Sequence, residues 1–345
     1  MRKVDQLLDD TARQRVETIS NMAPCEFEER IRLAEEPILF KSHVASWPSV
    51  AQARKSDDAL RDYLKSFDTG AELSCFYGSP ELAGRVFYND DFSGLNCARK
   101  TISLSGALDE ILKNAHDQTG RLIYIGATPV EDALPGFEKD NAVSLGGARA
   151  MENIWIGGPS RISAHYDFSD NLACVVAGDR RFILFPPGQL PNLYVGPLDF
   201  TPAGQPISLV DFHAPDFERH PRFRTALENA LVADLSPGDA LFIPSMWMHH
   251  VEAFSGLNVL VNFWHRRAPA FAGAPKDALD HAIMTLRDLP EDQKAPWREL
   301  FLYYVFENPK DLADHIPPGA RGILNLITPD AAASLRASLR NRLNA

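Results

Sequence analysis

Cysteine is scarce in this chain of 345 residues, and the few thiols form no pattern that would pair them or bind a metal. None has Cys-x-x-Cys spacing; they are Cys25, Cys75, Cys97 and Cys174. This excludes a disulfide framework and is typical of the reduced thiols of a cytoplasmic protein. An apolar N-terminal signal segment and a run of about 18 apolar residues are also missing, so we expect neither secretion nor a membrane span.

Long basic runs are missing as well, and the net charge is -11. Nucleic-acid binding needs Lys and Arg side chains that neutralise phosphates. We therefore expect no nucleic acid among the partners of this chain. With this acidic balance, a basic peptide remains possible as a partner.

The length would allow two domains, but we expect one catalytic domain with additions. We assign residues 1–120 to an N-terminal helical and β elaboration, 121–270 to a β core, and 271–345 to a C-terminal helical region. The long segment 187–224 interrupts the core. Because loops of this length in compact domains are usually functional, we assign it to a substrate-facing lip or a partner contact.

The sequence His165-Tyr166-Asp167 carries the strongest chemical signal, together with His249 some 80 residues later. Side chains at i and i+2 of a strand share a face, so His165 and Asp167 can reach one ion while a second strand supplies His249. Two histidines and one carboxylate form the facial triad of non-haem Fe(II) sites. His250 should then point to the opposite face, packed or hydrogen-bonded.

The context of these residues is rich in β-strand patterns. Two β-rich runs flank Gly178-Asp179 and predict a hairpin over 171–185, ended by Pro186 and Pro187. A short apolar strand is expected at 240–243, and a further pair of strands at 251–264 around Ser255-Gly256. We therefore expect both ligand-bearing segments on short strands of an all-β core.

These segments resemble the cupin-like branch of the JmjC Fe(II)/2-oxoglutarate oxygenases, which includes the asparaginyl hydroxylase of hypoxia-inducible factor and bacterial cupin-like proteins. The resemblance rests on five segments and is densest over residues 150–270. They are His165-Tyr-Asp167, Arg180-Arg-Phe-Ile-Leu-Phe-Pro-Pro187, Pro237-Gly-Asp-Ala-Leu-Phe-Ile-Pro244, Trp247-Met-His249-His250 and Asn262-Phe-Trp264. It implies a mainly β fold with helical additions: a double-stranded β-helix (cupin or jelly-roll core) of eight short strands with α+β elaboration.

Carried over to this chain, the resemblance places Fe(II) on His165, Asp167 and His249. It places the distal carboxylate of 2-oxoglutarate on Arg180, where the asparaginyl hydroxylase has a lysine. An arginine keeps the charge and can hold a carboxylate with two hydrogen bonds. Its neighbour Arg181 is expected on the other strand face, solvated or ion-paired.

Further pocket residues follow from the same resemblance. Asn171 and Asn262 match asparagines that line the co-substrate pocket, and Tyr124 is a candidate hydroxyl partner for the distal carboxylate. We assign Trp264 and Trp247 to the substrate pocket, with core packing as the alternative for Trp264.

One position departs from the family pattern. Three residues before its first ligand the family often has a threonine or serine that donates to 2-oxoglutarate, but this chain has Ile162 followed by Ser163. Either a one-residue bulge brings Ser163 into line, or that hydrogen bond is absent.

The resemblance implies an Fe(II)- and 2-oxoglutarate-dependent hydroxylase that acts on a C–H of a protein side chain or small molecule and releases succinate and CO2. The residues do not separate hydroxylation from demethylation. One alternative is a cupin-like metal-binding or scaffolding protein without 2-oxoglutarate turnover. Another is a cupin that uses its metal without a keto acid, for which Arg180 would be dispensable.

The C-terminal region has apolar residues at helical spacing over 277–289 and 291–306, followed by a last helix at 331–343. Aromatic side chains are frequent there, among them Tyr303, Tyr304 and Phe306. By resemblance we expect a homodimer through roughly 277–343. The alternative is that these faces pack on the chain's own barrel.

Overall fold

The computed structural model describes residues 14–147, 149–202 and 204–344, which form two compact units, one up to Arg266 and one from Arg267 onward. Residues 1–13, at the start of the predicted N-terminal elaboration, lie outside this description. The predicted elaboration and the β core share the first unit, because strands before residue 120 pair with strands after it. No helix in the described ranges has the length and apolar character needed to cross a membrane.

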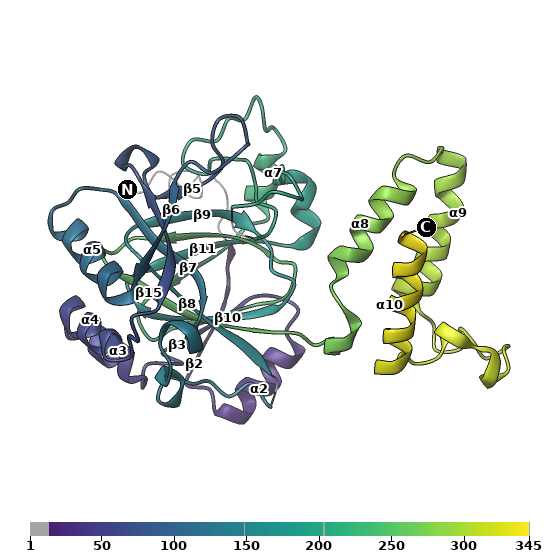
Figure 1. The fold of residues 1–345 in the computed structure, drawn as a ribbon, viewed down its shortest axis with the longest axis horizontal. Helices are drawn as coiled ribbons and strands as arrows, with labels where there is room; N and C mark the ends of the chain where they lie inside the picture. The colour runs from purple at the N-terminus through teal and green to yellow at the C-terminus, as the bar shows by residue number, and fades with distance from the viewer. Residues whose placement is uncertain (1–13, 148, 203, 345) are drawn as a thin grey trace. The chain divides into compact units, whose positions relative to one another are not determined.

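The first unit consists of two β-sheets (Figure 1). The six-stranded sheet has the order β1 (Gln14–Arg15), β12 (Leu231–Leu235), β11 (Arg180–Phe185), β14 (Met248–Ala253), β9 (Ser160–His165) and β5 (Arg85–Val86). The nine-stranded sheet has the order β2 (Glu17–Ser20), β3 (Ile38–Lys41), β13 (Ala240–Ile243), β10 (Asp170–Ala177), β15 (Asn258–His265), β8 (Ala150–Gly157), β7 (Leu122–Pro129), β4 (Glu72–Gly78) and β6 (Ala98–Ser103).

An apolar cluster between the sheets joins side chains from both of them. Phe182 and Leu184 of β11 contribute from one sheet, and Val175, Leu241 and Leu260 from the other. All but Leu260 are less than 4% exposed, and full burial of a Leu or Phe side chain stabilises a fold by about 1.5–3 kcal/mol. The two sheets and their shared interior confirm the predicted mainly β, jelly-roll type core with helical additions.

Helices cover the outer face of the nine-stranded sheet, and Figure 1 shows α3, α4 and α5 together on one side of the first unit. The helices of this unit are α2 (Pro24–Leu33), α3 (Pro48–Ala53), α4 (Asp57–Lys65), α5 (Leu104–His116), α6 (Val130–Ala133) and α7 (Phe223–Glu228). Serine caps fix two of the starts: Ser56 accepts from the amide of Ala59 ahead of α4, and Ser103 accepts from Gly106 ahead of α5.

The segment 187–224 covers the outer face of the six-stranded sheet. Leu193, Val210 and Phe212 of this segment pack with Ile183 and Phe185 of β11. The long connection is therefore a second covering layer with an apolar underside, which explains its length.

The predicted hairpin over 171–185 is wrong in its pairing. β10 and β11 are both strands, but β10 pairs with β13 and β15, whereas β11 pairs with β12 and β14. The turn at Gly178 therefore leads from one sheet to the other. Its φ of +76° suits glycine, and a Cβ there would collide with the side chain of Asn258.

The strands around Ser255-Gly256 behave in the same way, because β14 and β15 belong to different sheets. Three strands of the first unit, β6, β8 and β12, were not predicted at all. The part of residues 1–19 that the structure describes also forms strands, β1 and β2, which lie on sheet edges.

The second unit contains α8 (Pro275–Leu286), α9 (Glu291–Phe301), a π-helical turn (Leu302–Glu307) and α10 (Pro329–Leu343). The predicted helices match these elements closely. Neither α8 nor α9 contains a buried residue.

Candidate metal centre

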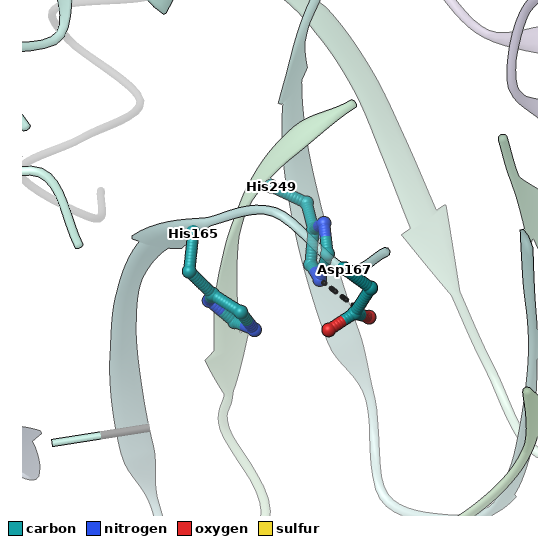
Figure 2. A group of neighbouring side chains, drawn as sticks. All are labelled: His165, Asp167 and His249. Atoms are coloured by element: carbon teal, nitrogen blue, oxygen red, sulfur yellow. Dashed lines mark ion pairs between the residues drawn. The ribbon is translucent and has the colours of Figure 1, made fainter. Parts of the chain in front are cut away.

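Three side chains from two strands and one connection meet at one end of the β core (Figure 2). His165 ends β9 and is the direct cross-strand partner of His249 on β14, with ring centroids 4.4 Å apart. Asp167 follows in the connection to β10, and its Oδ2 lies 3.7 Å from Nε2 of His249. One donor atom of each residue lies within 4.8 Å of the other two. Asp167 thus lies beyond the strand end and not on a strand, which corrects that part of the prediction.

The backbone fixes which nitrogen of each histidine faces the centre. Nδ1 of His165 lies 2.9 Å from the carbonyl oxygen of Ser163, and Nδ1 of His249 lies 3.0 Å from that of Trp247. When Nδ1 donates to a carbonyl, the lone pair is on Nε2. Burial, and then the nearby His165, lower the pKa of His249 to about 4. The ring is therefore neutral at pH 7, as a metal ligand must be.

Hydrogen bonds hold the Asp167 carboxylate in place. Asn171 on β10 and Trp264 on β15 each donate to its Oδ2 over 3.1 Å. Asn262 donates to Asn171 over 3.2 Å. Trp155 on β8 donates in turn to Asn262 over 2.9 Å.

This network gives structural positions to three predicted site residues, because Asn171, Asn262 and Trp264 all take part in it. Trp155 was missed, since the strand that contains it was not predicted. Trp155 is the one aromatic residue of β8, so the sequence offered no repeating pattern that would have indicated its role. Two imidazoles whose Nε2 atoms face the centre and a hydrogen-bonded carboxylate form a donor set that fits a divalent transition metal.

Arg180 lies in the interior between the sheets, and none of the residues that the structure describes forms an ion pair with it. It shares a strand face with Phe182 and Leu184, and Leu184 is the cross-strand partner of His249, so Arg180 lies about 13 Å further along the strand. Arg180 is 5% exposed, and its buried Nε has no hydrogen-bond partner. Burial lowers its pKa to about 10, so it keeps its charge at pH 7. The charge of Arg180 acts on the buried Tyr124, whose own pKa is raised by burial.

A cavity of about 420 Å³ opens beside His165. Its wall includes Tyr124 and Trp155, and four residues of the long connection close one side: Thr201, Pro202, Gly204 and Ile207. This position is consistent with the lip that was predicted for segment 187–224. The volume is within the usual range of small-molecule pockets.

Strand β9 contains an irregularity at the position that departs from the family pattern. His165 pairs with His249, and Ile162 pairs with Val251. The two pairs are therefore three residues apart on β9 but only two residues apart on β14. This is a β-bulge, and it puts Ile162 on the same inner face as His165. Ser163 also lines the cavity, and its carbonyl accepts from His165. A bulge was one of the two alternatives, but the bulge in the structure keeps Ile162, and not Ser163, on the strand face that His165 shares.

Three further predicted positions lie away from the centre. Trp247 does not line the cavity, because its ring packs in the interior cluster and its indole N–H donates to the carbonyl of Glu35 over 3.1 Å. His250 faces outward as predicted; its ring stacks on Phe212 at 4.4 Å, and its Nε2 lies 3.1 Å from Glu252. Arg181 is ion-paired with Asp234 over 2.6 Å, also as predicted.

Comparison with known proteins gives one matching family and several relatives. A family model described as Cupin-like domain matches residues 24–271. Human HSPB1-associated protein 1 is 35% identical over 263 residues, 72% of this chain and 51% of that protein. The lysine-specific demethylase JMJ31 of Arabidopsis thaliana is 37% identical over 113 residues, 32% of this chain and 20% of that protein.

The human bifunctional peptidase and (3S)-lysyl hydroxylase JMJD7 is 31% identical over 143 residues, 35% of this chain and 43% of that protein. The chain spans less than two thirds of the length of each of these relatives. Two of the three are named for modifying lysine.

Proposed function

Since this chain belongs to the family of cupin-like domains, we propose that it is an oxygenase that uses Fe(II) and 2-oxoglutarate to hydroxylate a C–H bond of a protein side chain or small molecule, releasing succinate and CO2. The observation that carries the proposal is the convergence of His165, Asp167 and His249 on one point. When bound, the ion and the keto acid supply the oxidising chemistry. The chain's own residues bind, orient and shield them.

In this proposal the two imidazoles bind the ion through Nε2, because their Nδ1 atoms are held by backbone carbonyls. Asn171 and Trp264 hold Oδ2 of Asp167, and the described residues offer no hydrogen-bond donor to the other carboxylate oxygen. That oxygen is therefore available to the ion. Donors around a ligand carboxylate of this kind orient it and tune its affinity for metal.

Arg180 supports the co-substrate part of the proposal. Its charge is buried, and in the described part of the chain no carboxylate pairs with it. An uncompensated buried charge costs several kcal/mol, so the fold favours a bound anion at this position. The distal carboxylate of 2-oxoglutarate supplies that charge, and the neighbouring Tyr124 can add its hydroxyl.

Anaerobic titration of the protein with Fe(II) and 2-oxoglutarate tests this function. A weak visible absorption band should appear, and in air the protein should form succinate even without its substrate. Asp167→Ala should abolish both signals, whereas Asp179→Ala, in the turn between β10 and β11, should keep them. Iron-loaded protein that gives neither band nor succinate would overturn the proposal.

One observation favours a second candidate, a cupin-like protein that binds metal without 2-oxoglutarate turnover. Ile162 occupies the inner-row position where the resembling enzymes have a hydroxyl donor for the co-substrate. For this candidate, or for a cupin that uses metal without a keto acid, Arg180→Ala should leave metal-dependent function unchanged. A loss of succinate formation in that variant favours the oxygenase.

We also propose that two copies of the chain pair through the second unit. On α9 and the π-helical turn, Trp297, Leu300, Tyr304, Val305 and Phe306 are each more than two fifths exposed. Contiguous exposed apolar surface of this kind is typical of protein interfaces. A second copy covers it symmetrically.

A cytoplasmic location is part of the same proposal. It is supported by four cysteines that are all unpaired, two of them buried. Buried free thiols are typical of proteins from reducing compartments.

A further inference from the structure

The cavity beside His165 extends outward along three neighbouring strands. Tyr124 on β7 pairs directly with Phe76 on β4, and Phe76 pairs directly with Arg99 on β6. All three residues line the cavity, so a row of side chains on one face of this sheet forms part of the cavity wall. Strands lie about 4.8 Å apart, which puts the backbone of Arg99 roughly 9–10 Å further out than that of Tyr124.

Among the described residues that line the cavity, Arg99 is the only Lys, Arg, Asp or Glu, although the chain has 46 acidic residues. Its guanidinium is held on the cavity face: Nε donates to Ser74, and the group lies 5.9 Å from the centre of the Phe76 ring. No carboxylate among residues 14–147, 149–202 and 204–344 forms an ion pair with it. Its two terminal nitrogens therefore remain available to a ligand.

Aromatic, aliphatic and neutral polar residues, together with His165, make up the rest of the wall that the structure describes. Phe76, Tyr124 and Trp155 follow one another with ring centroids 6.3 Å apart. Hydroxyl groups accompany them, from Ser74, Thr128 and Thr201. In the part of the wall that the structure describes, the cavity thus combines a passage lined with aromatic rings, one cationic end and no acidic side chain.

We propose that Arg99 binds an anionic group of the substrate, a carboxylate or a phosphate. The aromatic row then encloses the apolar part of the substrate, and the reacting C–H lies at the His165 end. This inference rests on the proposed function. The inference adds one feature to that function: the substrate is an anion. A passage lined with aromatic rings separates its charge from the reacting carbon.

The co-substrate does not account for Arg99. The unpaired charge of Arg180 lies in the interior beside Tyr124, whereas Arg99 lies two strands further out and is exposed. One five-carbon diacid that chelates a metal at His165 cannot reach both. Two cations at separate depths fit two separate anions.

Binding to protein loaded with Mn(II) and 2-oxoglutarate tests the inference without turnover. The probes are three fluorescent peptide pools of equal length, rich in Asp and Glu, neutral, or rich in Lys. Two small anions, N-acetylaspartate and phenyl phosphate, serve as competitors. The wild-type chain should prefer the acidic pool, or one of the small anions over its uncharged amide or alcohol, by about tenfold.

Arg99→Ala should remove this preference, and Arg99→Glu should turn it toward the Lys-rich pool. Lys100→Ala is the matched control, because it removes the same charge from the opposite face of β6, where Lys100 lies 5.3 Å from the Tyr77 ring. Acidic-pool binding identifies a peptide source, and binding of the small anions alone identifies a small-molecule source. Either supports the inference.

A wild-type protein that binds all probes equally, or an Arg99→Ala variant that keeps the preference, would overturn it. 2-Oxoglutarate affinity is measured on the same samples. Failure of the wild type to bind 2-oxoglutarate contradicts the proposed function. Normal 2-oxoglutarate binding without any anion preference contradicts only the role of Arg99.

Discussion

Asp167 is the ligand whose orientation depends most on neighbouring side chains, because it lies outside the strands. Trp264→Phe removes one of the two hydrogen bonds to its Oδ2 and keeps most of the ring. Changes to such partners typically lower metal affinity 10- to 100-fold. We expect about a tenfold weaker Mn(II) or Fe(II) affinity, measured by anaerobic titration.

Trp247→Phe is the matched control for this prediction. It removes an indole N–H that donates to the carbonyl of Glu35 and keeps the backbone carbonyl of residue 247 that holds His249. It should lower the unfolding temperature without changing metal affinity. Equal metal affinities in the two variants would show that Trp264 does not orient the ligand.

Because the carboxylate of Glu252 is buried and hydrogen-bonded, we expect the free energy of unfolding to depend on its protonation. Burial alone would raise its pKa, but hydrogen bonds from His213 and His250 outweigh this and hold it well below the usual carboxyl value. A depressed pKa stabilises the fold above the unfolded carboxyl value of about 4.3, and the contribution is lost as pH falls below it. Glu252→Gln should therefore destabilise the protein at pH 7 by about 1.5–3 kcal/mol.

Urea unfolding of both proteins between pH 7 and pH 3.5 measures this difference in free energy. It should be largest near neutrality and shrink below about pH 4.3. A difference that stays constant over the whole range would contradict the role of the carboxylate charge.

At the scale of elements, the bulge in β9 determines which side chain of the strand faces the co-substrate position. Ile162→Thr would place a hydroxyl in the inner row without changing the branched shape of the side chain. A hydrogen bond to a charged group contributes about 1.5–3 kcal/mol. We expect about tenfold tighter binding of 2-oxoglutarate, measured by calorimetry under nitrogen.

Ser163→Thr adds a methyl group at the neighbouring position of the same bulge and serves as control. It should leave the affinity for 2-oxoglutarate within about twofold, since it adds no hydrogen-bond donor. If Ile162→Thr binds 2-oxoglutarate no better than the wild type, the inner-row assignment is wrong.

The turn at Gly178 connects the two sheets and positions Arg180 directly after it. Gly178→Ala forces a Cβ against Asn258 at a positive φ. Gly136→Ala has a similarly positive φ of +95°, but its Cβ would meet open space. The left-handed conformation costs about 1–2 kcal/mol in both variants, and only Gly178→Ala adds the collision.

Thermal unfolding should therefore rank Gly178→Ala clearly below Gly136→Ala, and both below the wild type. Equal losses would mean that Asn258 moves aside without cost. The ranking uses the same substitution at both sites, so side-chain entropy is matched.

Strand positions could be predicted from the sequence better than strand partners. The segments at 171–177, 180–185 and 240–243 were expected as strands and are strands. β10 and β11 are buried on both faces, so they lack the alternation that would indicate which sheet each joins. A turn signal such as Gly178-Asp179 looks the same in a hairpin and in a corner between sheets.

At the scale of the whole molecule, the ligand set was predictable because residue type, spacing and order all constrain it. The motif also pointed to Arg180, whose role as a co-substrate residue stays a prediction. Trp155 and Arg99 could not be predicted, because their place in the wall depends on the pairing of β8 and β6 with distant strands. Long-range pairing of this kind leaves little trace in a single sequence.

The proposed pairing of two copies predicts a change in mass. Phe306 is 72% exposed, so Phe306→Asp should cost little in folding while placing a charge in the interface. Sedimentation should show a dimer for the wild type and a monomer for this variant. Leu33→Asp, at the exposed end of α2, is the control and should stay dimeric. A wild-type monomer at tens of micromolar would contradict the pairing.

Both β-sheets hold the three converging side chains in place, so metal binding should stabilise the packing of one sheet against the other. The two histidines belong to the six-stranded sheet, whereas the carboxylate is anchored by β10 and β15 of the other. An ion bound by all three side chains would connect the two sheets at this end of the core. Amide hydrogen exchange in β14 and β15 should then slow together on loading, and the melting point should rise with free ion concentration.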